Sequence, residues 1–156
     1  GCPSMIKPEL EFVYEATGEL EEPRQIGETY DGTRRIIPII GGTVTGSRLN
    51  GRILSVGADW QTVHDTGLAV LDTRYALETD NGATIEIINY GYRFGPPDVL
   101  AALARGEAVP ADQYYMRTQA RLETGDPRYE WVNRTLFIGT GMRHADAVTV
   151  ALYAVE

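Results

Sequence analysis

Residues 68–94, LAVLDTRYALETDNGATIEIINYGYRF, decide the fold of this chain. Apolar and polar residues alternate on both sides of Thr79-Asp80-Asn81-Gly82, and this alternation is typical of strands with one buried face. Asn-Gly readily supplies the positive φ angles of a tight turn. The stretch therefore predicts a long β-hairpin, with strands over residues 68–78 and 83–94.

The same alternation recurs from end to end. It predicts further strands over residues 10–16, 34–42, 51–58, 114–123, 131–139 and 147–155. One helix is predicted over residues 97–105, because Pro96-Pro97-Asp98 forms a helix start and Gly106 suits the C-terminal cap. The helix lies between the strands predicted over residues 83–94 and 114–123, where it could cover one end of a barrel.

About eight antiparallel strands in a chain of this length predict an all-β fold, a single antiparallel β-barrel with one short helix. Closure removes exposed strand edges and leaves an interior that can hold one small ligand. A two-sheet sandwich is the alternative. Small residues at Gly41-Gly42, Gly57 and Gly91 favour the strong curvature of a barrel.

The length of 156 residues indicates one domain, over residues 5–156. Residues 1–4, Gly-Cys-Pro-Ser, resemble a cloning remnant before Met5. Cys2 is therefore not expected to take part in disulfide or thiolate chemistry. No apolar run approaches the ~20 residues of a membrane span and no signal segment opens the chain, so we expect a cytoplasmic location.

The net charge of −8 argues against nucleic acids and anionic membranes as partners, because both require a basic face. A small-molecule ligand is the expected partner, and assembly into a homo-oligomer is left open. His64 and His144 stand in apparent loops without the spacing of metal ligands, so no metal and no organic cofactor is predicted. Asp65-Thr66-Gly67, a sequence of aspartic proteases, occurs once and is better explained as a turn.

Charged and aromatic residues inside the predicted strands indicate a pocket. They are Arg74, Tyr90, Arg93, Tyr114, Tyr115, Arg117, Trp131 and Asn133. Leaving a buried guanidinium unpaired costs several kcal/mol. If Arg74 and Arg117 point inward, they offer partners for a carboxylate, phenolate or enolate. If they point outward, they are surface residues or structural partners of Asp72 and Glu78, and the pattern alone does not decide.

Asp59 follows Gly57-Ala58 and precedes Trp60 at the end of a predicted strand. A carboxylate beside an indole can act as a general base, although it can equally cap a turn. We expect Asp59 at the mouth or wall of the pocket, with Trp60 limiting the access of water. Burial would raise the pKa of Asp59, but a neighbouring arginine such as Arg74 is expected to outweigh burial and lower it.

Tyr129, Trp131 and Asn133 alternate at the start of the strand predicted over 131–139, so they would share one face. An aromatic surface with a carboxamide suits a ring-bearing ligand. Such aromatics are also commonly core residues.

Many short motifs follow one another between residues 35 and 133, within a resemblance that covers roughly residues 10–155. They are Arg35, Pro38-Ile39, Gly41-Gly42, Gly46, Leu49, Gly51, Gly57-Ala58-Asp59-Trp60, Leu71-Asp72, Arg74-Tyr75, Asp80, Gly82-Ala83, Gly91, Tyr115-Met116-Arg117-Thr118 and Tyr129-Glu130-Trp131 with Asn133. This order resembles the DUF3237 family, also called UPF0311, of small bacterial and fungal β-barrel proteins. The resemblance raises five residues above the other candidates: Asp59, Arg74, Arg117, Trp131 and Asn133. The chain departs from the family pattern at Met116, where phenylalanine is expected, and this would reshape one wall of the pocket.

Two functions of different classes fit these residues. The first is an enzyme without metal or organic cofactor that transfers protons on a small carbonyl or phenolic substrate, as an isomerase, cyclase or lyase does. Asp59 would be the base or acid, while Arg74 and Arg117 would hold an anionic group or stabilise an enolate. The expected ligand contacts, of which Tyr90 and Tyr115 are also candidate proton donors, are Trp60, Tyr90, Tyr115, Tyr129, Trp131 and Asn133.

The second function is a non-catalytic barrel that binds a small anionic or aromatic metabolite. The sequence does not separate this from an enzyme. A structural oligomer, in which the aromatic residues form the core or an interface, is a third alternative.

Overall fold

The hairpin that residues 68–94 predict is formed by β6 (Ala69–Thr79) and β7 (Thr84–Phe94) in the computed structural model, which describes residues 4–156. Within the turn, Gly82 has a positive φ of 93°, and its N–H donates to the carbonyl oxygen of Thr79 at 2.9 Å. Asn81 keeps a negative φ. The glycine alone therefore supplies the conformation that other residues rarely adopt.

Eight other strands and three short helical segments complete the described part of the chain. The strands are β1 (Leu10–Leu20), β2 (Arg24–Thr29), β3 (Gly32–Gly46), β4 (Gly51–Ile53), β5 (Gly57–Val63), β8 (Tyr115–Glu123), β9 (Phe137–Arg143) and β10 (Ala147–Val155). The helical segments are α1 (Pro97–Ala104) and the 3-10 turns η1 (Ala111–Gln113) and η2 (Pro127–Arg134).

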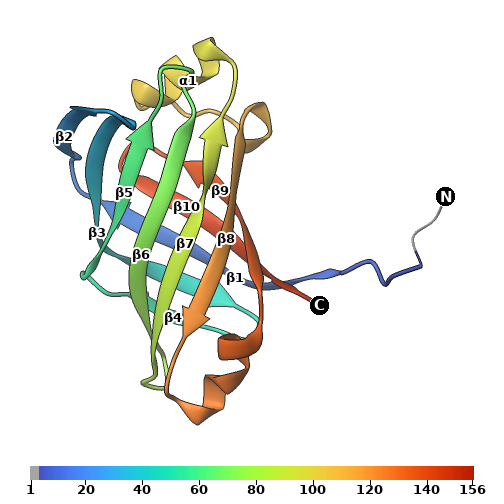
Figure 1. The fold of residues 1–156 in the computed structure, drawn as a ribbon. Coiled ribbons are helices and arrows are strands. Elements are labelled where there is room, and N and C mark those ends of the chain that lie inside the picture. Colours follow the sequence, from blue (N-terminus) through green and yellow to red (C-terminus); the bar gives the residue numbers. More distant parts are fainter. Residues whose placement is uncertain (1–3) are drawn as a thin grey trace.

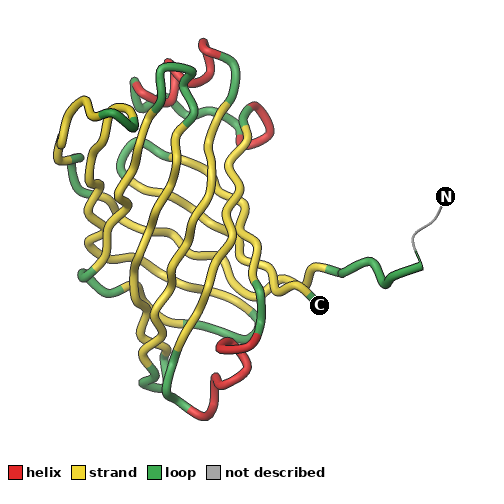
Figure 2. The backbone as a smooth tube through the Cα atoms, in the orientation of Figure 1, coloured by secondary structure: helices red, strands yellow, loops and turns green. Residues whose placement is uncertain are grey.

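The sheet closes on itself. Its strands follow the order β1-β10-β9-β8-β7-β6-β4-β3-β2, β5 pairs with both β3 and β6, and pairing of β1 with β3 completes the ring. The result is an eight-strand antiparallel barrel with two extra strands (Figure 1). Strands of the front and back walls cross at a large angle (Figure 2), as the tilt of a closed barrel requires. The predicted all-β barrel is confirmed, and the sandwich is not formed.

The residues predicted as one strand over 51–58 divide between β4 and β5. Asp59, expected at the end of a strand, therefore lies inside β5 and in the wall of the barrel. The sequence did not predict β2, because nearly all of its residues are exposed and show no apolar alternation. The first three residues, with Cys2, lie outside the described part of the chain.

The strand predicted over 131–139 is wrong in its first half. Residues 127–134 form η2, whose first turn is capped by the side chain of Asp126, which accepts the N–H of Arg128 at 2.9 Å. β9 begins only at Phe137. The alternation of aromatic and polar residues before Phe137 therefore belongs to a helical turn.

The two ends of the barrel are covered by different elements (Figure 1). α1 lies at one end, where Val99 and Leu103 pack against an apolar cluster that includes Leu71 and Met116. η2 lies at the opposite end beside the main core, which contains Leu77, Ile85, Leu122 and Phe137. The helix predicted over 97–105 is confirmed, and it covers one end as expected.

Tyr14 and Tyr75 pair their hydroxyl groups at 2.7 Å within the main core. We expect Tyr14→Phe or Tyr75→Phe to lower the free energy of unfolding by about 1–3 kcal/mol, because each leaves a buried hydroxyl unpaired. The double Phe variant should cost less than the sum of the two, since it removes both members of the pair. Urea denaturation of the three variants measures this, and strictly additive losses would show that the two hydroxyls are not coupled.

Candidate active site

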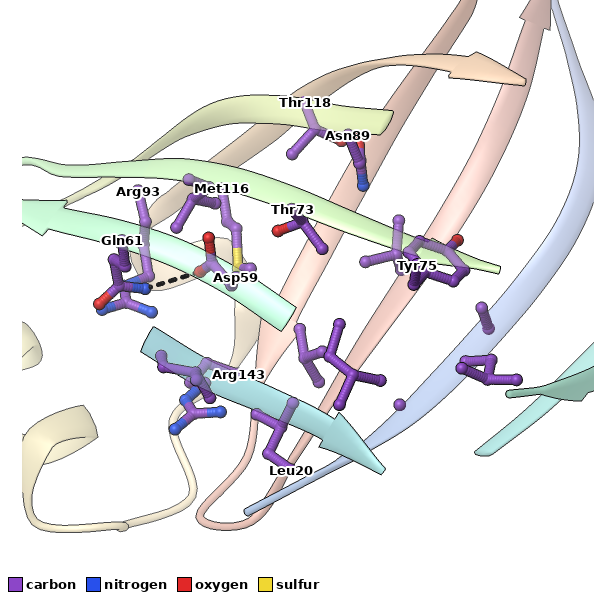
Figure 3. A pocket seen from close by; sticks show the side chains of 18 residues that line it. Leu20, Asp59, Gln61, Thr73, Tyr75, Asn89, Arg93, Met116, Thr118 and Arg143 are labelled. Atoms are coloured by element: carbon purple, nitrogen blue, oxygen red, sulfur yellow. Dashed lines mark hydrogen bonds between the residues drawn. The ribbon is translucent and has the colours of Figure 1, made fainter. Parts of the chain in front are cut away.

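A cavity of about 70 Å³, partly open to solvent, lies inside the barrel. It extends between the two apolar clusters, since Ile39 and Tyr75 belong to the main core while Leu71 and Met116 belong to the cluster under α1. Figure 3 shows the side chains that line it. The lining residues are Ala16, Gly18, Leu20, Ile37, Ile39, Ile53, Asp59, Gln61, Leu71, Thr73, Tyr75, Asn89, Arg93, Met116, Thr118, Arg143, Val148 and Val150.

Asp59 is fixed in the cavity wall by two hydrogen bonds. Its Oδ1 accepts a hydrogen bond from the backbone N–H of Asp72 at 2.9 Å. Its Oδ2 accepts one from Nε2 of Gln61 at 3.1 Å, the bond drawn as a dashed line in Figure 3. The backbone pairing of β5 with β6 is interrupted between Asp59 and Thr62, while the register is the same on both sides of the gap. The carboxylate of Asp59 thus accepts the N–H of Asp72 in the gap where a backbone carbonyl of β5 would otherwise accept a hydrogen bond from β6. The pairing of the two strands therefore fixes the position of the carboxylate.

Gln61 connects Asp59 to Arg35. Gln61 is 1% exposed, and its Oε1 accepts Nε of Arg35 at 2.8 Å while its amide group donates to Asp59. Both polar ends of the amide are used, so its orientation is fixed. Because an ionised carboxylate can accept about four hydrogen bonds, Asp59 can still accept a hydrogen bond from a ligand in the cavity.

Burial raises the pKa of Asp59 above its ordinary value, and loss of solvation is the dominant cause. The hydrogen bonds from Asp72 and Gln61 and the charge of Arg93 lower the pKa without reversing this shift. The expectation that a neighbouring arginine would outweigh burial is therefore wrong. A carboxylate with a raised pKa is a stronger base when it is ionised.

Three arginines gather at the end of the cavity where Asp59 lies: Arg35 from β3, Arg93 from β7 and Arg143 from β9. Figure 3 shows Arg93 and Arg143 near Asp59. Burial lowers the pKa of all three, to about 10 for Arg93, and repulsion between arginines adds to the shifts of Arg93 and Arg143. None of the ion pairs among residues 4–156 involves any of the three. The acidic chain therefore keeps an excess of positive charge inside its barrel.

Three polar atoms of the cavity-lining residues are buried without a hydrogen-bond partner: Oδ1 of Asn89, Nε of Arg93 and Oγ1 of Thr118. They come from the adjacent strands β7 and β8. Each buried group left unpaired costs about 1–3 kcal/mol, so native proteins rarely tolerate several in one place. Asn89 and Thr118 lie along the wall at some distance from Arg93 (Figure 3), so the unpaired atoms offer polar contacts to a ligand along this wall.

The remainder of the lining is mostly apolar, with Ile37, Ile53, Val148 and Val150 among its side chains. An apolar cavity with a few polar groups at one end is typical of a small-molecule site. The polar end combines a base with cations that can stabilise negative charge on a substrate oxygen.

A family model with the description "Protein of unknown function (DUF3237)" matches residues 8–155. The chain belongs to the DUF3237 family. The UPF0311 protein RPA1785 of Rhodopseudomonas palustris is 42% identical over 147 residues, which cover 94% of this chain and 96% of that protein.

Solved structures share the DUF3237 barrel. A β-barrel-like protein of Acinetobacter baumannii superposes with a TM-score of 0.86 at 43% identity, covering 98% of this chain and 99% of that protein. A protein of Penicillium herquei, whose crystal structure is described as that of an enzyme, superposes with a TM-score of 0.74 at 18% identity. That comparison covers 99% of this chain and all of the fungal protein, and it shows a common fold.

In this DUF3237 barrel, Asp59 lines the cavity, but Arg74 and Arg117 are exposed on the outer face. Their expected inward orientation is wrong. On β6 and β8 the residues on either side of each arginine are the ones that turn inward or are buried, so the arginines point outward. The Arg117 guanidinium donates to the carbonyl oxygen of Met116 at 3.0 Å and lies 5.6 Å from the Tyr115 ring.

Three of the predicted ligand contacts also lie on the outside. Trp60 is 40% exposed, so it does not shield Asp59 from water. Tyr90 packs edge-on against Tyr92, and Tyr115 stacks on Phe94 with ring centroids 4.8 Å apart. Neither tyrosine can serve as a proton donor to the cavity.

The other three predicted contacts belong to η2, at the end of the barrel away from α1 (Figure 1). Tyr129 donates its hydroxyl to Oδ1 of Asn81 at 2.7 Å, and Trp131 packs beneath the guanidinium of Arg48 at 3.6 Å. The Asn133 side chain bonds the backbone N–H and carbonyl of Thr124 at 2.8 and 2.9 Å. These residues fasten a loop and do not line the cavity.

The sequence analysis named Arg93 among the strand residues that indicate a pocket but gave it no role, and it did not select Arg35 or Arg143 for the site. A signal was present for Arg93, because it shares the alternation phase of the buried Ile85, Ile87 and Asn89 on β7. Arg143 had no such signal, since the preceding inward positions of β9 include glycines.

Within residues 4–156, no three or more His, Cys, Asp or Glu side chains gather as a metal site. None of the helices in that range has the length and apolar character needed to cross a membrane.

Proposed function

We propose that this protein is a small-molecule enzyme that transfers a proton on a carbonyl or phenolic substrate inside the barrel, as an isomerase, cyclase or lyase does. The observation that carries the proposal is the position of Asp59, a desolvated carboxylate fixed by the ladder and facing a cavity that also contains Arg93 and Arg143. A general base needs a fixed geometry and a raised pKa, and Asp59 has both.

In the proposed reaction, Asp59 removes a proton from a carbon next to the substrate carbonyl. The electron pair of the broken C–H bond forms a carbon–carbon double bond, and the carbonyl oxygen becomes an enolate. The guanidinium of Arg93 or Arg143 stabilises that negative oxygen. Protonated Asp59 then returns the proton to another atom of the conjugated system, so the step balances with no further reactant.

Two features support this assignment. All the groups that the proton transfer needs are side chains of this chain. The Penicillium herquei protein, which shares the fold, is described as an enzyme, so a barrel of this kind is compatible with catalysis.

The alternative is a binding barrel that holds its ligand without turnover. The specific observation in its favour is the excess of arginines over carboxylates, because Asp59 would then serve only to balance charge. The two functions differ in whether the protein accelerates a proton exchange.

The test is deuterium exchange in D₂O. Phenylpyruvate and the neutral ketone phenylacetone each carry a benzylic C–H next to a carbonyl, and NMR follows loss of that proton signal with and without protein. We expect the protein to accelerate exchange of at least one of them, and Asp59→Asn to abolish the acceleration. Binding of these compounds without any acceleration would favour the binding barrel.

A further inference from the structure

We infer that the ligand of this cavity is a small amphipathic carboxylate, with its ionised group held by Arg93 and Arg143 and its apolar body inside the barrel. The inference rests on the proposed function, because the ligand would occupy the same cavity in which the proton transfer is proposed to take place. It concerns binding, however, and does not require turnover.

Positive side chains outnumber the one carboxylate that lines the cavity at the end where Asp59 lies. Among residues 4–156, Arg93 and Arg143 join no ion pair, and Nε of Arg93 is buried without a hydrogen-bond partner, although both side chains are partly removed from water and Asp146 is a further negative charge near Arg143. Asp59 is one negative charge, and two of its bonds already go to Asp72 and Gln61. A buried guanidinium without a partner lowers stability, so these two groups favour the binding of an anion from outside the chain.

The two guanidinium groups favour a carboxylate as the anion. Guanidinium groups present planar pairs of N–H donors that match the two oxygens of a carboxylate. Away from them the cavity is lined mainly by side chains of the main core such as Ile39 and Ile53, which cannot solvate a second charged group. The ionised group must therefore stay at the arginine end, while an apolar or aromatic body occupies the interior.

The positions of Arg93 and Asp59 determine how the ligand is oriented. Arg93 and Asp59 lie at the same end, so a carbon close to the carboxylate comes nearest to the base (Figure 3). Oδ1 of Asn89 and Oγ1 of Thr118 are unpaired along the neighbouring wall. A hydroxyl group on the ligand body would complete the hydrogen bonding of these two residues.

The probes are benzoate and benzamide, which have nearly the same shape and differ in charge. Isothermal titration calorimetry at neutral pH should show benzoate binding roughly tenfold or more tighter than benzamide, because only benzoate forms charge-assisted hydrogen bonds. Arg93→Met and Arg143→Met should each weaken benzoate binding by roughly tenfold or more and leave benzamide nearly unchanged. Arg74→Met and Arg117→Met, which remove outward-facing arginines, are the matched controls and should bind benzoate as the parent protein does.

Equal affinity for benzoate and benzamide, or no heat from either, would overturn the inference. So would unchanged benzoate binding in both cavity variants. Phenyl phosphate tests the other source of negative charge, and tighter binding of phenyl phosphate than of benzoate would assign the site to a phosphate instead. Exchange of phenylacetone without benzoate binding would refute this inference and leave the proposed function standing, whereas benzoate binding without any exchange would do the reverse.

Discussion

Replacing Asp59 by asparagine is expected to lower turnover by roughly two to four orders of magnitude, the usual contribution of a general base. Asparagine has nearly the shape of aspartate, and its carbonyl oxygen can still accept one of the two hydrogen bonds. Affinity for an anionic ligand should not fall, since the substitution removes a negative charge from the cavity. Initial rates and calorimetry on the same preparation separate the two effects.

Asp72→Asn is the matched control. The Asp72 side chain is on the outer face of β6, and only its backbone N–H reaches Asp59. Turnover should therefore stay close to that of the parent. Equal activity of Asp59→Asn and Asp72→Asn would remove Asp59 from the mechanism.

The pH dependence of the same reaction follows from the raised pKa of Asp59. The base is active when ionised, so the rate should fall as pH decreases through the pKa of Asp59, at a pH above the ordinary 3.8. The acid limb of the rate profile measures that pKa. A limb at or below 3.8 would contradict the dominance of burial.

Arg93→Met is expected to make the protein more stable while it loses its anionic ligand. Burial and the neighbouring arginines lower the pKa of Arg93 from 12.5 to about 10. Between these values the unfolded chain binds the proton more strongly, so stability rises with pH across that window. Below the folded-state pKa of Arg93, about 10, the folded state carries the full cost of the charge.

Methionine removes this cost and fills much of the same volume. The free energy of unfolding near pH 7 should increase by about 1–3 kcal/mol, while Asp59 keeps Arg35 and Arg143 as neighbouring cations. Urea denaturation of Arg93→Met and of the outward control Arg117→Met provides the comparison. A loss of stability in Arg93→Met would show that its guanidinium is already paired within the folded protein.

The architecture could be predicted from the sequence because apolar residues facing the barrel interior alternate with polar residues facing outward along each strand. The turn at Gly82, the alternation through β6 and β7, and the helix start at Pro97 are readable within a few residues. β2 and η2 were missed or misassigned for the opposite reason: exposed strands and short 3-10 turns have no apolar alternation of their own.

The site was only partly predictable. Asp59 could be selected, but Arg74 was chosen although the inward phase of its strand passes through Leu71, Thr73 and Tyr75. The same alternation on β8, where Met116 and Thr118 are buried, places Arg117 on the outer face. Convergence of Asp59 with Arg143 depends on the register between strands far apart in the chain, which no local pattern contains.

We expect an organic anion to bind inside the barrel, between Asp59 and the guanidinium groups of Arg93 and Arg143. The crystal structure of the protein grown with benzoate would locate that anion. We predict the carboxylate within hydrogen-bonding distance of the Arg93 and Arg143 guanidinium groups, with the ring against Ile37 and Val148. Benzoate bound only to the outer face of the barrel, with Arg93 and Arg143 paired to groups of the protein itself, would contradict the claim.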